Sequence, residues 1–233
     1  MSFPLRGKVA VITGAGRGIG RAIARHLSQS RTVVAVARTE SELIETASVS
    51  EAIHAHVADV AGSGAIAGIA AVAAGLGRLD VWVNSAATLE PRPLADITDG
   101  EWRRVMAVNL DACFAACREA LQRMSATGGG IIVNIASLSG VAGVEKFPGL
   151  ASYNVSKAGV IALTEAVALE GREHGVRCVA ISPGAVDTAM LRRAAPHLNP
   201  GMTPDDVASI VDFLVSDAAA PLTGTNIPIH SNR

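Results

Sequence analysis

A glycine-rich stretch near the start of the chain, VAVITGAGRGIGRAI at residues 9–23, constrains the possible folds most strongly. The apolar run 9–13 predicts a buried strand, and the amphipathic pattern that begins at Ile19 predicts a helix. The turn between them contains four glycines: Gly14, Gly16, Gly18 and Gly20. Glycine has no Cβ and adopts positive φ readily, so the backbone of such a turn can approach a pyrophosphate closely at the start of a helix.

The glycine spacing differs from the Gly-x-Gly-x-x-Gly pattern, because Ile19 stands where a third glycine would follow Gly14 and Gly16. The pattern is instead Thr-Gly-x-x-x-Gly-Ile-Gly over residues 13–20. Glycine-rich turns between strands and helices also occur for packing reasons alone. The loop therefore indicates dinucleotide binding, and this prediction needs support from motifs elsewhere in the chain.

The bulk composition suits one α/β domain over residues 1–233, with 49% hydrophobic and 18% charged residues. The chain has 20 basic and 21 acidic residues, which gives a net charge of -1. Such a balance provides no overall field that would attract nucleic acid or an anionic membrane. A small anionic ligand must therefore be held by local charges.

Apolar strand-like runs alternate with helical patterns along the whole chain. The runs are continuous rather than alternating, which indicates a sheet covered on both faces. We predict a three-layer, doubly wound Rossmann-type α/β fold with a parallel sheet of about seven strands and ligands at the carboxyl ends of the strands. The expected strands are 9–13, 32–37, 53–57, 80–84, 131–135, 177–181 and a short one near 227. The expected helices are 19–29, 41–47, 63–74, 101–124, 152–173 and 204–214.

Three further features bear on location. The uncharged segment 60–77 consists mostly of alanine and glycine, which favours a buried helix over a membrane span. Cys113, Cys117 and Cys178 lack metal-ligand spacing, so we expect buried free thiols in a reducing compartment. No secretion signal is expected ahead of the first strand. A cytoplasmic protein is the resulting prediction.

Tyr153, the only tyrosine in the chain, precedes Lys157 by four residues on a predicted helix. Both side chains therefore project from one face. A neighbouring ammonium stabilises a phenolate, which would lower the tyrosine pKa from about 10 toward neutral and create a proton donor and acceptor. An isolated Tyr-x-x-x-Lys pair is more often an ordinary helix surface.

This pair is not isolated, because other motifs accompany it in a fixed order. They are Thr13–Gly20, Asp59, Asn84-Ser85-Ala86-Ala87, Asn109, Ser137, Tyr153 with Lys157, and Pro183-Gly184. In this order the chain resembles the short-chain dehydrogenase/reductase family from about residue 5 to residue 229. The resemblance implies an oxidoreductase that transfers hydride between a nicotinamide cofactor and a carbonyl or secondary alcohol.

The resemblance implies four catalytic residues. Ser137 would hydrogen-bond the substrate carbonyl oxygen, and Tyr153 would protonate that oxygen or act as the base in the reverse direction. Lys157 would lower the tyrosine pKa and bind the nicotinamide ribose, and Asn109 would hold a proton-relay water. Ser139 is a less favoured rival for Ser137.

The resemblance also implies a cofactor site along the strand ends. Asp59 would accept from the adenine amine, and the segment 183–188 would hold the nicotinamide carboxamide. The family often has Asn-Asn-Ala-Gly where this chain has Asn-Ser-Ala-Ala from Asn84, so the first Asn and the Ala are kept. The expected cofactor contacts are Gly14, Gly16, Arg17, Gly18, Ile19, Gly20, Arg38, Thr39, Asp59, Val60, Asn84, Ala86, Tyr153, Lys157, Pro183, Gly184, Val186 and Thr188.

The end of the second predicted strand reads Val36-Ala37-Arg38-Thr39 and lacks the acid that usually binds the ribose 2′-hydroxyl of NAD. Arg38 can pair with a 2′-phosphate in bidentate fashion, and Arg17 can approach from the glycine loop. We therefore expect NADP(H) rather than NAD(H). Two solvated arginines at strand ends are the alternative.

The substrate lid, at about residues 189–202, is shorter than in many members of the family, so we expect an open site that tolerates bulky carbonyls. Pro228 in the last strand predicts an edge position, because proline cannot donate to a ladder. The resemblance implies a homodimer through the long helices of residues 101–124 and 152–173, with a homotetramer less certain. Ala112, Ala115 and Ala116 would permit close helix packing.

Two other functions remain open. A 3-oxoacyl-[acyl-carrier-protein] reductase would favour basic residues near the mouth of the site, whereas residues 127–130 are neutral. A catalytically silent dinucleotide-sensing regulatory protein would need the glycine loop without the proton donor. The expected partners are a small-molecule carbonyl or alcohol substrate and further copies of the chain, with no nucleic acid, membrane or metal.

Overall fold

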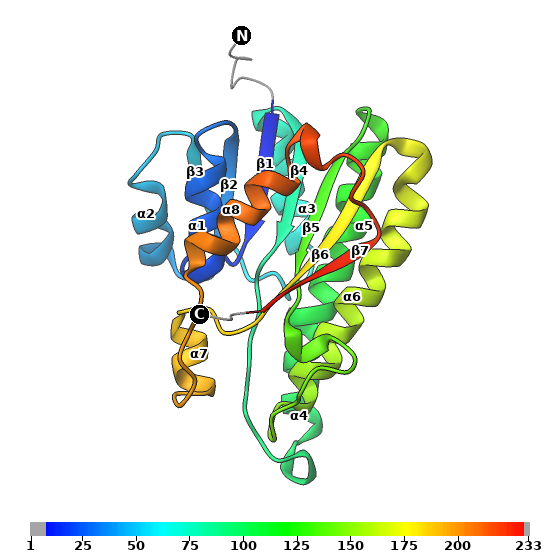
Figure 1. The fold of residues 1–233 in the computed structure, drawn as a ribbon. Helices are drawn as coiled ribbons and strands as arrows, with labels where there is room; N and C mark the ends of the chain where they lie inside the picture. The colour runs from blue at the N-terminus through cyan, green and yellow to red at the C-terminus, as the bar shows by residue number, and fades with distance from the viewer. Residues whose placement is uncertain (1–7, 231–233) are drawn as a thin grey trace.

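The computed structural model describes residues 8–230 and contains a seven-stranded parallel sheet in the order β3-β2-β1-β4-β5-β6-β7 (Figure 1). The sheet order reverses its direction between β1 and β4, as in doubly wound folds. The strands are β1 Lys8–Thr13, β2 Thr32–Ala37, β3 Ile53–Val57, β4 Arg78–Asn84, β5 Gly130–Ile135, β6 Val176–Pro183 and β7 Thr225–Ile229. The predicted Rossmann-type architecture is confirmed.

Helices cover both faces of the sheet (Figure 1). The α-helices are α1 Gly18–Leu27, α2 Glu40–Ala47, α3 Ala65–Leu76, α4 Asp99–Met106, α5 Ala112–Ala126, α6 Ala151–Gly171, α7 Ala189–Ala194 and α8 Pro204–Leu214. Short 3-10 turns occupy Leu94–Asp96, Leu138–Gly140, Arg172–His174 and Asp217–Ala219, and a π-helical segment spans Ala107–Asp111. One face carries α1 and α8 with part of α2, and the other carries α3, α5 and α6.

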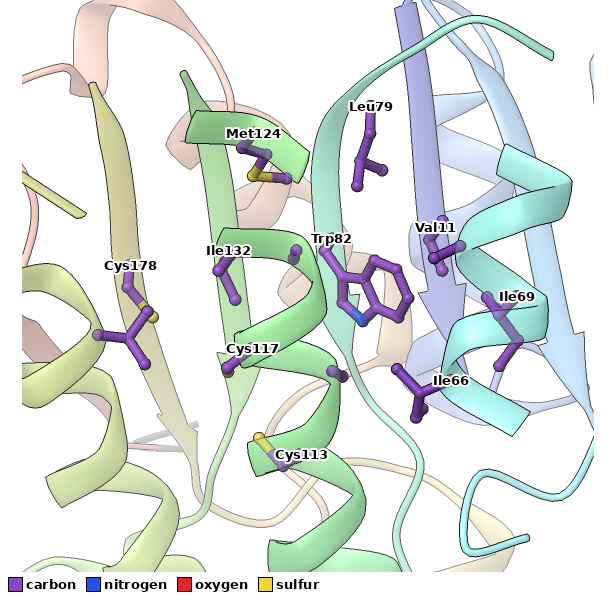
Figure 2. Packing of buried hydrophobic residues seen from close by; sticks show 14 of the residues in the cluster. Val11, Ile66, Ile69, Leu79, Trp82, Cys113, Cys117, Met124, Ile132 and Cys178 are labelled. Atoms are coloured by element: carbon purple, nitrogen blue, oxygen red, sulfur yellow. The ribbon is translucent and has the colours of Figure 1, made fainter. Parts of the chain in front are cut away.

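The core has two halves because side chains of a strand alternate between the faces of a sheet. Val9 and Val11 of β1 belong to the half under α3, α5 and α6, whereas Ala10 and Ile12 belong to the half under α1 and α8. Trp82 of β4 is fully buried and points between α3 and α5 (Figure 2). Burial on both sides explains why these strands are continuous apolar runs in the sequence.

A buried polar network crosses the α5 and α6 side of the core. Trp82 donates from Nε1 to Oδ1 of Asn84 at 3.0 Å, and Asn84 donates from Nδ2 to Oδ1 of Asn134 at 2.8 Å. Asn134 in turn donates from Nδ2 to Oγ1 of Thr164 on α6 at 2.9 Å. Burying a polar group costs free energy unless the group is hydrogen-bonded, so this series of hydrogen bonds fixes β4, β5 and α6 relative to one another.

The three cysteines surround Asn134. The Sγ atoms of Cys113 and Cys117 lie 3.5 and 3.6 Å from its Oδ1, and its Nδ2 lies 3.5 Å from Sγ of Cys178. All three are buried and free, as predicted, and Figure 2 shows them on α5 and β6. The carboxamide thus supplies polar partners to thiols in an otherwise apolar layer.

The long helix predicted over residues 101–124 is confirmed as continuous helical backbone, in which the π-helical turn Ala107–Asp111 joins α4 to α5. One expectation about a helix needs correction. The helix expected to be buried, α3, buries only Ile66, Ile69, Ala70 and Ala73. It lies on the outside of the sheet, where a period of 3.6 residues brings one stripe to the core.

The ends of the chain and the membrane question complete the comparison. β7 lies at the edge of the sheet, and Pro228 pairs there with Ser182 of β6, as predicted. Among the described residues, no helix combines the length and apolar character that a membrane crossing requires. The expectation about a secretion signal concerns residues 1–7, which lie outside the described residues.

Two glycine substitutions test this packing. A Cβ at Gly20 of α1 would lie 2.3 Å from the carbonyl oxygen of Gly14, whereas a Cβ at Gly68 of α3 meets nothing within 4 Å. We expect Gly20→Ala to lower the free energy of unfolding by about 1–3 kcal/mol through overpacking. Gly68→Ala should raise it by about 0.5–1 kcal/mol, because alanine loses less backbone entropy. Urea unfolding measures both, and equal effects would contradict the packing.

Candidate active site

The glycine loop between β1 and α1 lies against the loop that follows β4. Gly14 and Gly18 adopt positive φ of 69° and 54°. A Cβ at Gly14 would lie 2.7 Å from Cα of Ala86, so a side chain there would push the two loops apart. Thr13 fixes the approach, because its Oγ1 accepts the N–H groups of Ser85 and Ala86 at 3.1 and 3.2 Å. The absence of a side chain at Gly14 therefore allows the two loops to pack in direct contact at the carboxyl end of the sheet.

The segment after β6 reaches the same loop. A Cβ at Gly18 would lie 3.3 Å from Cγ2 of Thr188. Thr188 caps α7, because its Oγ1 accepts the N–H of Leu191 at 3.2 Å. Gly184 donates its N–H to the carbonyl of Ile229 at 2.9 Å, and Val186 forms a bridge with Met202. The structure thus brings the predicted segment 183–188 next to the glycine loop.

A narrow hollow lies at the carboxyl ends of β1 and β4, next to α3 and the start of α5. It brings together Val60, Asn84 and Ala86, which the sequence analysis assigns to cofactor binding. Its lining is Thr13, Val60, Ile66, Asn84, Ala86, Val108, Ala112 and Cys113. The side-chain amide of Asn84 is hydrogen-bonded to Trp82 and Asn134 in the core. Asn84 can therefore contact a ligand only through its other atoms. Cys113 is a lining residue that the sequence analysis missed, since only the packing of α5 brings it here.

Ser137, which follows the carboxyl end of β5, lies next to Tyr153 and Lys157 of α6. The side chain of Ser137 lies near the hydroxyl of Tyr153 and lowers the pKa of that phenol. Ser137 also accepts the N–H of Ser139 through its Oγ at 3.1 Å, which fixes its position in the turn. That turn lies close to α6 because Gly140 has no side chain, and a Cβ there would lie 2.5 Å from the carbonyl carbon of Lys157. The geometry favours Ser137 over Ser139.

Lys157 is buried beside this pair, with 3% of its surface exposed. Its Nζ donates to the carbonyl oxygen of Ile135 at 2.7 Å and lies 5.7 Å from the centroid of the Tyr153 ring. Burial lowers the pKa of Lys157 from 10.5 to about 8, and the nearby Cys113 opposes this shift. The ammonium is therefore anchored to the sheet and gives up its proton more readily than an exposed lysine.

The pKa of Tyr153 is shifted in the direction opposite to the one that its spacing from Lys157 predicts. Burial raises the pKa above its ordinary value, and the nearby side chain of Ser137 only partly opposes this. The sequence predicts that the Lys157 ammonium lies near Tyr153, but it does not show how far the phenol and the ammonium are buried. In this structure, Tyr153 is thus held as a neutral phenol, which is a proton donor.

Asn109 lies in the π-helical segment between α4 and α5 and is buried. Its Oδ1 accepts the N–H of Thr88 at 2.8 Å, and its Nδ2 donates to the carbonyl of Thr88 at 2.9 Å and to Oγ of Ser156 at 3.1 Å. The side chain therefore connects the loop after β4 to α6, one residue before Lys157. Its polar atoms are engaged with the protein itself.

The charged residues expected at the adenosine end lie at the carboxyl ends of β1, β2 and β3. Arg17, Arg38 and Thr39 are exposed, and Asp59 accepts the N–H of Ala61 through one carboxylate oxygen at 3.1 Å. Arg17 also pairs with Glu42 of α2, with 3.6 Å between Nη1 and Oε1. Glu42 is not predicted from the sequence, because its pair with Arg17 joins the glycine loop to a different helix.

A doubly wound sheet with a glycine loop and a serine, tyrosine and lysine cluster at its carboxyl end defines the Rossmann-type oxidoreductases. The short chain dehydrogenase family model matches residues 8–199. The chain belongs to the short-chain dehydrogenase/reductase family, whose members use NAD or NADP.

Individual relatives cover almost the whole chain. A (5R,7aS)-5-hydroxy-7a-methyl-1-oxo-2,3,5,6,7,7a-hexahydro-1H-indene-carboxyl-CoA reductase of Mycobacterium tuberculosis is 39% identical over 97% of this chain and 92% of its own length. A 3beta-hydroxysteroid dehydrogenase 1 of Eggerthella lenta is 36% identical over 96% and 92%. A solved structure described as a short-chain alcohol dehydrogenase from Sinorhizobium meliloti 1021 superposes with a TM-score of 0.88 at 34% identity, over 98% of this chain and 96% of that one.

The lowered pKa of Lys157 predicts how stability depends on pH. Between about pH 8 and about pH 10.5, the unfolded lysine binds a proton that the folded lysine has released, so the free energy of unfolding rises with pH in this window. Relative to Lys157→Met, the wild type should gain about 2 kcal/mol between about pH 7 and about pH 9.5. Urea unfolding of both proteins across this range measures the difference. A difference that is independent of pH would show that the folded lysine is not perturbed.

Proposed function

We propose that this chain is an NADP(H)-dependent dehydrogenase/reductase that transfers hydride between the nicotinamide and a carbonyl or secondary alcohol, with Tyr153 as general acid and base. The observation that carries this proposal is the gathering of three side chains at one place: Ser137 lies near enough to Tyr153 to influence its pKa, and the buried ammonium of Lys157 lies 5.7 Å from the tyrosine ring centroid. A dinucleotide sensor without catalysis has no use for a proton donor in this place.

Ser137, Tyr153 and Lys157 have separate roles in the proposed reaction. In the reducing direction, Ser137 donates its O–H to the substrate carbonyl oxygen, and Tyr153 delivers the proton that this oxygen needs as the carbon is reduced. The bound nicotinamide supplies the hydride. Lys157, with a pKa of about 8, can return a proton toward Tyr153 near neutral pH. In the oxidising direction, Tyr153 must first release its own proton, which neutral Lys157 can take up, and the resulting phenolate then accepts the alcohol proton.

Asn109 is a positioning residue in this proposal. Its side chain holds the backbone of Thr88 and the hydroxyl of Ser156. This arrangement sets the loop after β4 against the part of α6 that carries Lys157. A proton-relay water beside Lys157 would then be bound by the surrounding backbone rather than by the Asn109 amide.

The residues present fit a dinucleotide. Gly14 and Gly18 form a cradle that a Cβ would fill at Ala86 and Thr188. Arg38 is exposed and forms no ion pair with any residue in the range 8–230. It therefore remains available for a 2′-phosphate, which supports NADP(H), and Asp59 keeps a free carboxylate oxygen for the adenine amine.

The proposed substrate class is a bulky or cyclic secondary alcohol or its ketone. The lid is short, because α7 contains only six residues. Arg193 of α7 donates from Nη2 to the carbonyl of Leu89 at 3.1 Å, so the lid touches the loop after β4 at its far end. The relatives from Mycobacterium tuberculosis and Eggerthella lenta carry ring-containing substrates in their names, which agrees with this proposal.

We further propose a homodimer or homotetramer formed through α5 and α6. Phe114 of α5 and Val155 and Leu169 of α6 are exposed apolar side chains, which favour contact with another copy. Ala112 and Ala116, expected to allow helix packing across this interface, are buried against the chain's own core instead.

We also propose a cytoplasmic, reducing setting. The support comes from Cys113, Cys117 and Cys178, which are held as free thiols around Asn134.

The direct test replaces the proton donor. Tyr153→Phe should lower turnover by about 100- to 10,000-fold, because the general acid is lost, while the dissociation constant of NADPH should change by less than about twofold. Ser139→Ala is the matched control and should retain turnover. Purified protein is assayed with NADPH and a panel of cyclic ketones, and NADPH binding is measured by fluorescence.

Two results would contradict the proposal. Unchanged turnover in Tyr153→Phe would remove Tyr153 from its role. Tighter binding of NADH than of NADPH by the wild type would contradict the assignment of NADP(H).

A further inference from the structure

A carboxylate packs directly against the glycine loop. Glu42 lies in the first turn of α2, and a Cβ at Gly16 would lie 2.8 Å from its Oε2 and 3.1 Å from its Cβ. Its other oxygen, Oε1, lies 3.6 Å from Nη1 of Arg17. The side chain of Glu42 is 31% exposed and that of Arg17 is 67% exposed. The carboxylate of Glu42 therefore lies next to Arg17, the arginine of the glycine loop that is proposed to bind the cofactor.

The backbone around Glu42 is fixed to the loop by separate contacts. Arg21 donates from Nε to the carbonyl of Gly16 at 2.9 Å and forms an ion pair with Glu45. Thr46 donates from Oγ1 to the carbonyl of Ala15 at 2.9 Å, in a buried position. Because α2 is held at two points along its length, the Glu42 carboxylate remains within reach of the loop whether or not it has a partner.

Arg17 is held much less firmly. The Arg17–Glu42 separation of 3.6 Å is long for a charge-assisted hydrogen bond, and more than half of the arginine side chain is in water. Exposed ion pairs of this kind contribute little free energy. A phosphate can therefore replace Glu42 as the partner of Arg17, but the displaced carboxylate stays nearby as a like charge.

We propose that Glu42 is a specificity-determining residue that limits the preference for NADP(H) over NAD(H). Its carboxylate competes with the 2′-phosphate for Arg17 and repels that phosphate after displacement. The ribose 2′-hydroxyl of NAD(H) carries no charge and meets neither penalty. This inference rests on the proposed adenosine site at the ends of β1 and β2.

The test measures cofactor binding directly, without turnover. Glu42→Gln keeps the length of the side chain and its contact with Gly16 but removes the charge. We expect the dissociation constant of NADPH to fall by about three- to tenfold, while that of NADH changes by less than about twofold. Isothermal titration calorimetry at low and high salt gives both constants, and the gain for NADPH should shrink as salt screens the charges.

Two variants serve as controls. Glu45→Gln removes a carboxylate from the same helix, but Glu45 pairs with Arg21 rather than Arg17. It should change both dissociation constants by less than about twofold. In an Arg17→Gln background, Glu42→Gln should lose most of its effect, because a double-mutant cycle isolates the interaction of the two residues.

The outcomes separate this inference from the proposed function. If Glu42→Gln leaves the affinity for NADPH unchanged, or changes NADPH and NADH binding equally, the role of Glu42 is overturned while the adenosine site stands. A gain of the same size in Glu45→Gln would also overturn it, because the effect would then be general charge. If the wild type binds neither cofactor, the proposed function fails and this inference fails with it.

Discussion

The hydrogen bond from the buried ammonium of Lys157 to the carbonyl of Ile135 is the constraint on which the rest of the site depends. It ties α6 to the carboxyl end of β5, two residues before Ser137 and on the helix that carries Tyr153. A charged group taken out of water needs such a partner, since an unpaired buried ammonium would be strongly destabilising. The cost is visible in the lowered pKa of Lys157. Two further contacts hold α6 against β5: the close approach of Gly140 to Lys157 and the hydrogen bond between Asn134 and Thr164.

The same burial decides the protonation of Tyr153. The Nζ atom of Lys157 lies 5.7 Å from the tyrosine ring centroid and donates one N–H to the carbonyl of Ile135. Burial of the phenol therefore outweighs the attraction between the ammonium and a phenolate, and the pKa of Tyr153 is raised. The resting site therefore holds its proton on Tyr153, next to the side chain of Ser137. Lys157 is buried and Tyr153 is partly buried, and burial shifts the pKa of each group in favour of its neutral form.

The sequence predicts the sheet closely because parallel strands buried on both faces leave continuous apolar runs. The expected ranges of β2, β3 and α8 agree with the structure. The pairing of Tyr153 with Lys157 follows equally from helical spacing. The π-helical turn at Asn109 was not predicted, since one added residue barely changes a short hydrophobic pattern. Glu42 and Cys113 were missed because they reach the site through tertiary packing, and the shift of the tyrosine pKa was mispredicted because burial cannot be read from spacing.

The central claim is that burial, not the neighbouring ammonium, sets the protonation of Tyr153 in the free protein. Because the chain has one tyrosine, a pH titration of tyrosinate absorbance reports this residue alone, with circular dichroism monitoring the fold. The account predicts ionisation above the ordinary value of about pH 10, with little change in Lys157→Met. Ionisation below about pH 10 in the wild type, moving upward in Lys157→Met, would contradict it.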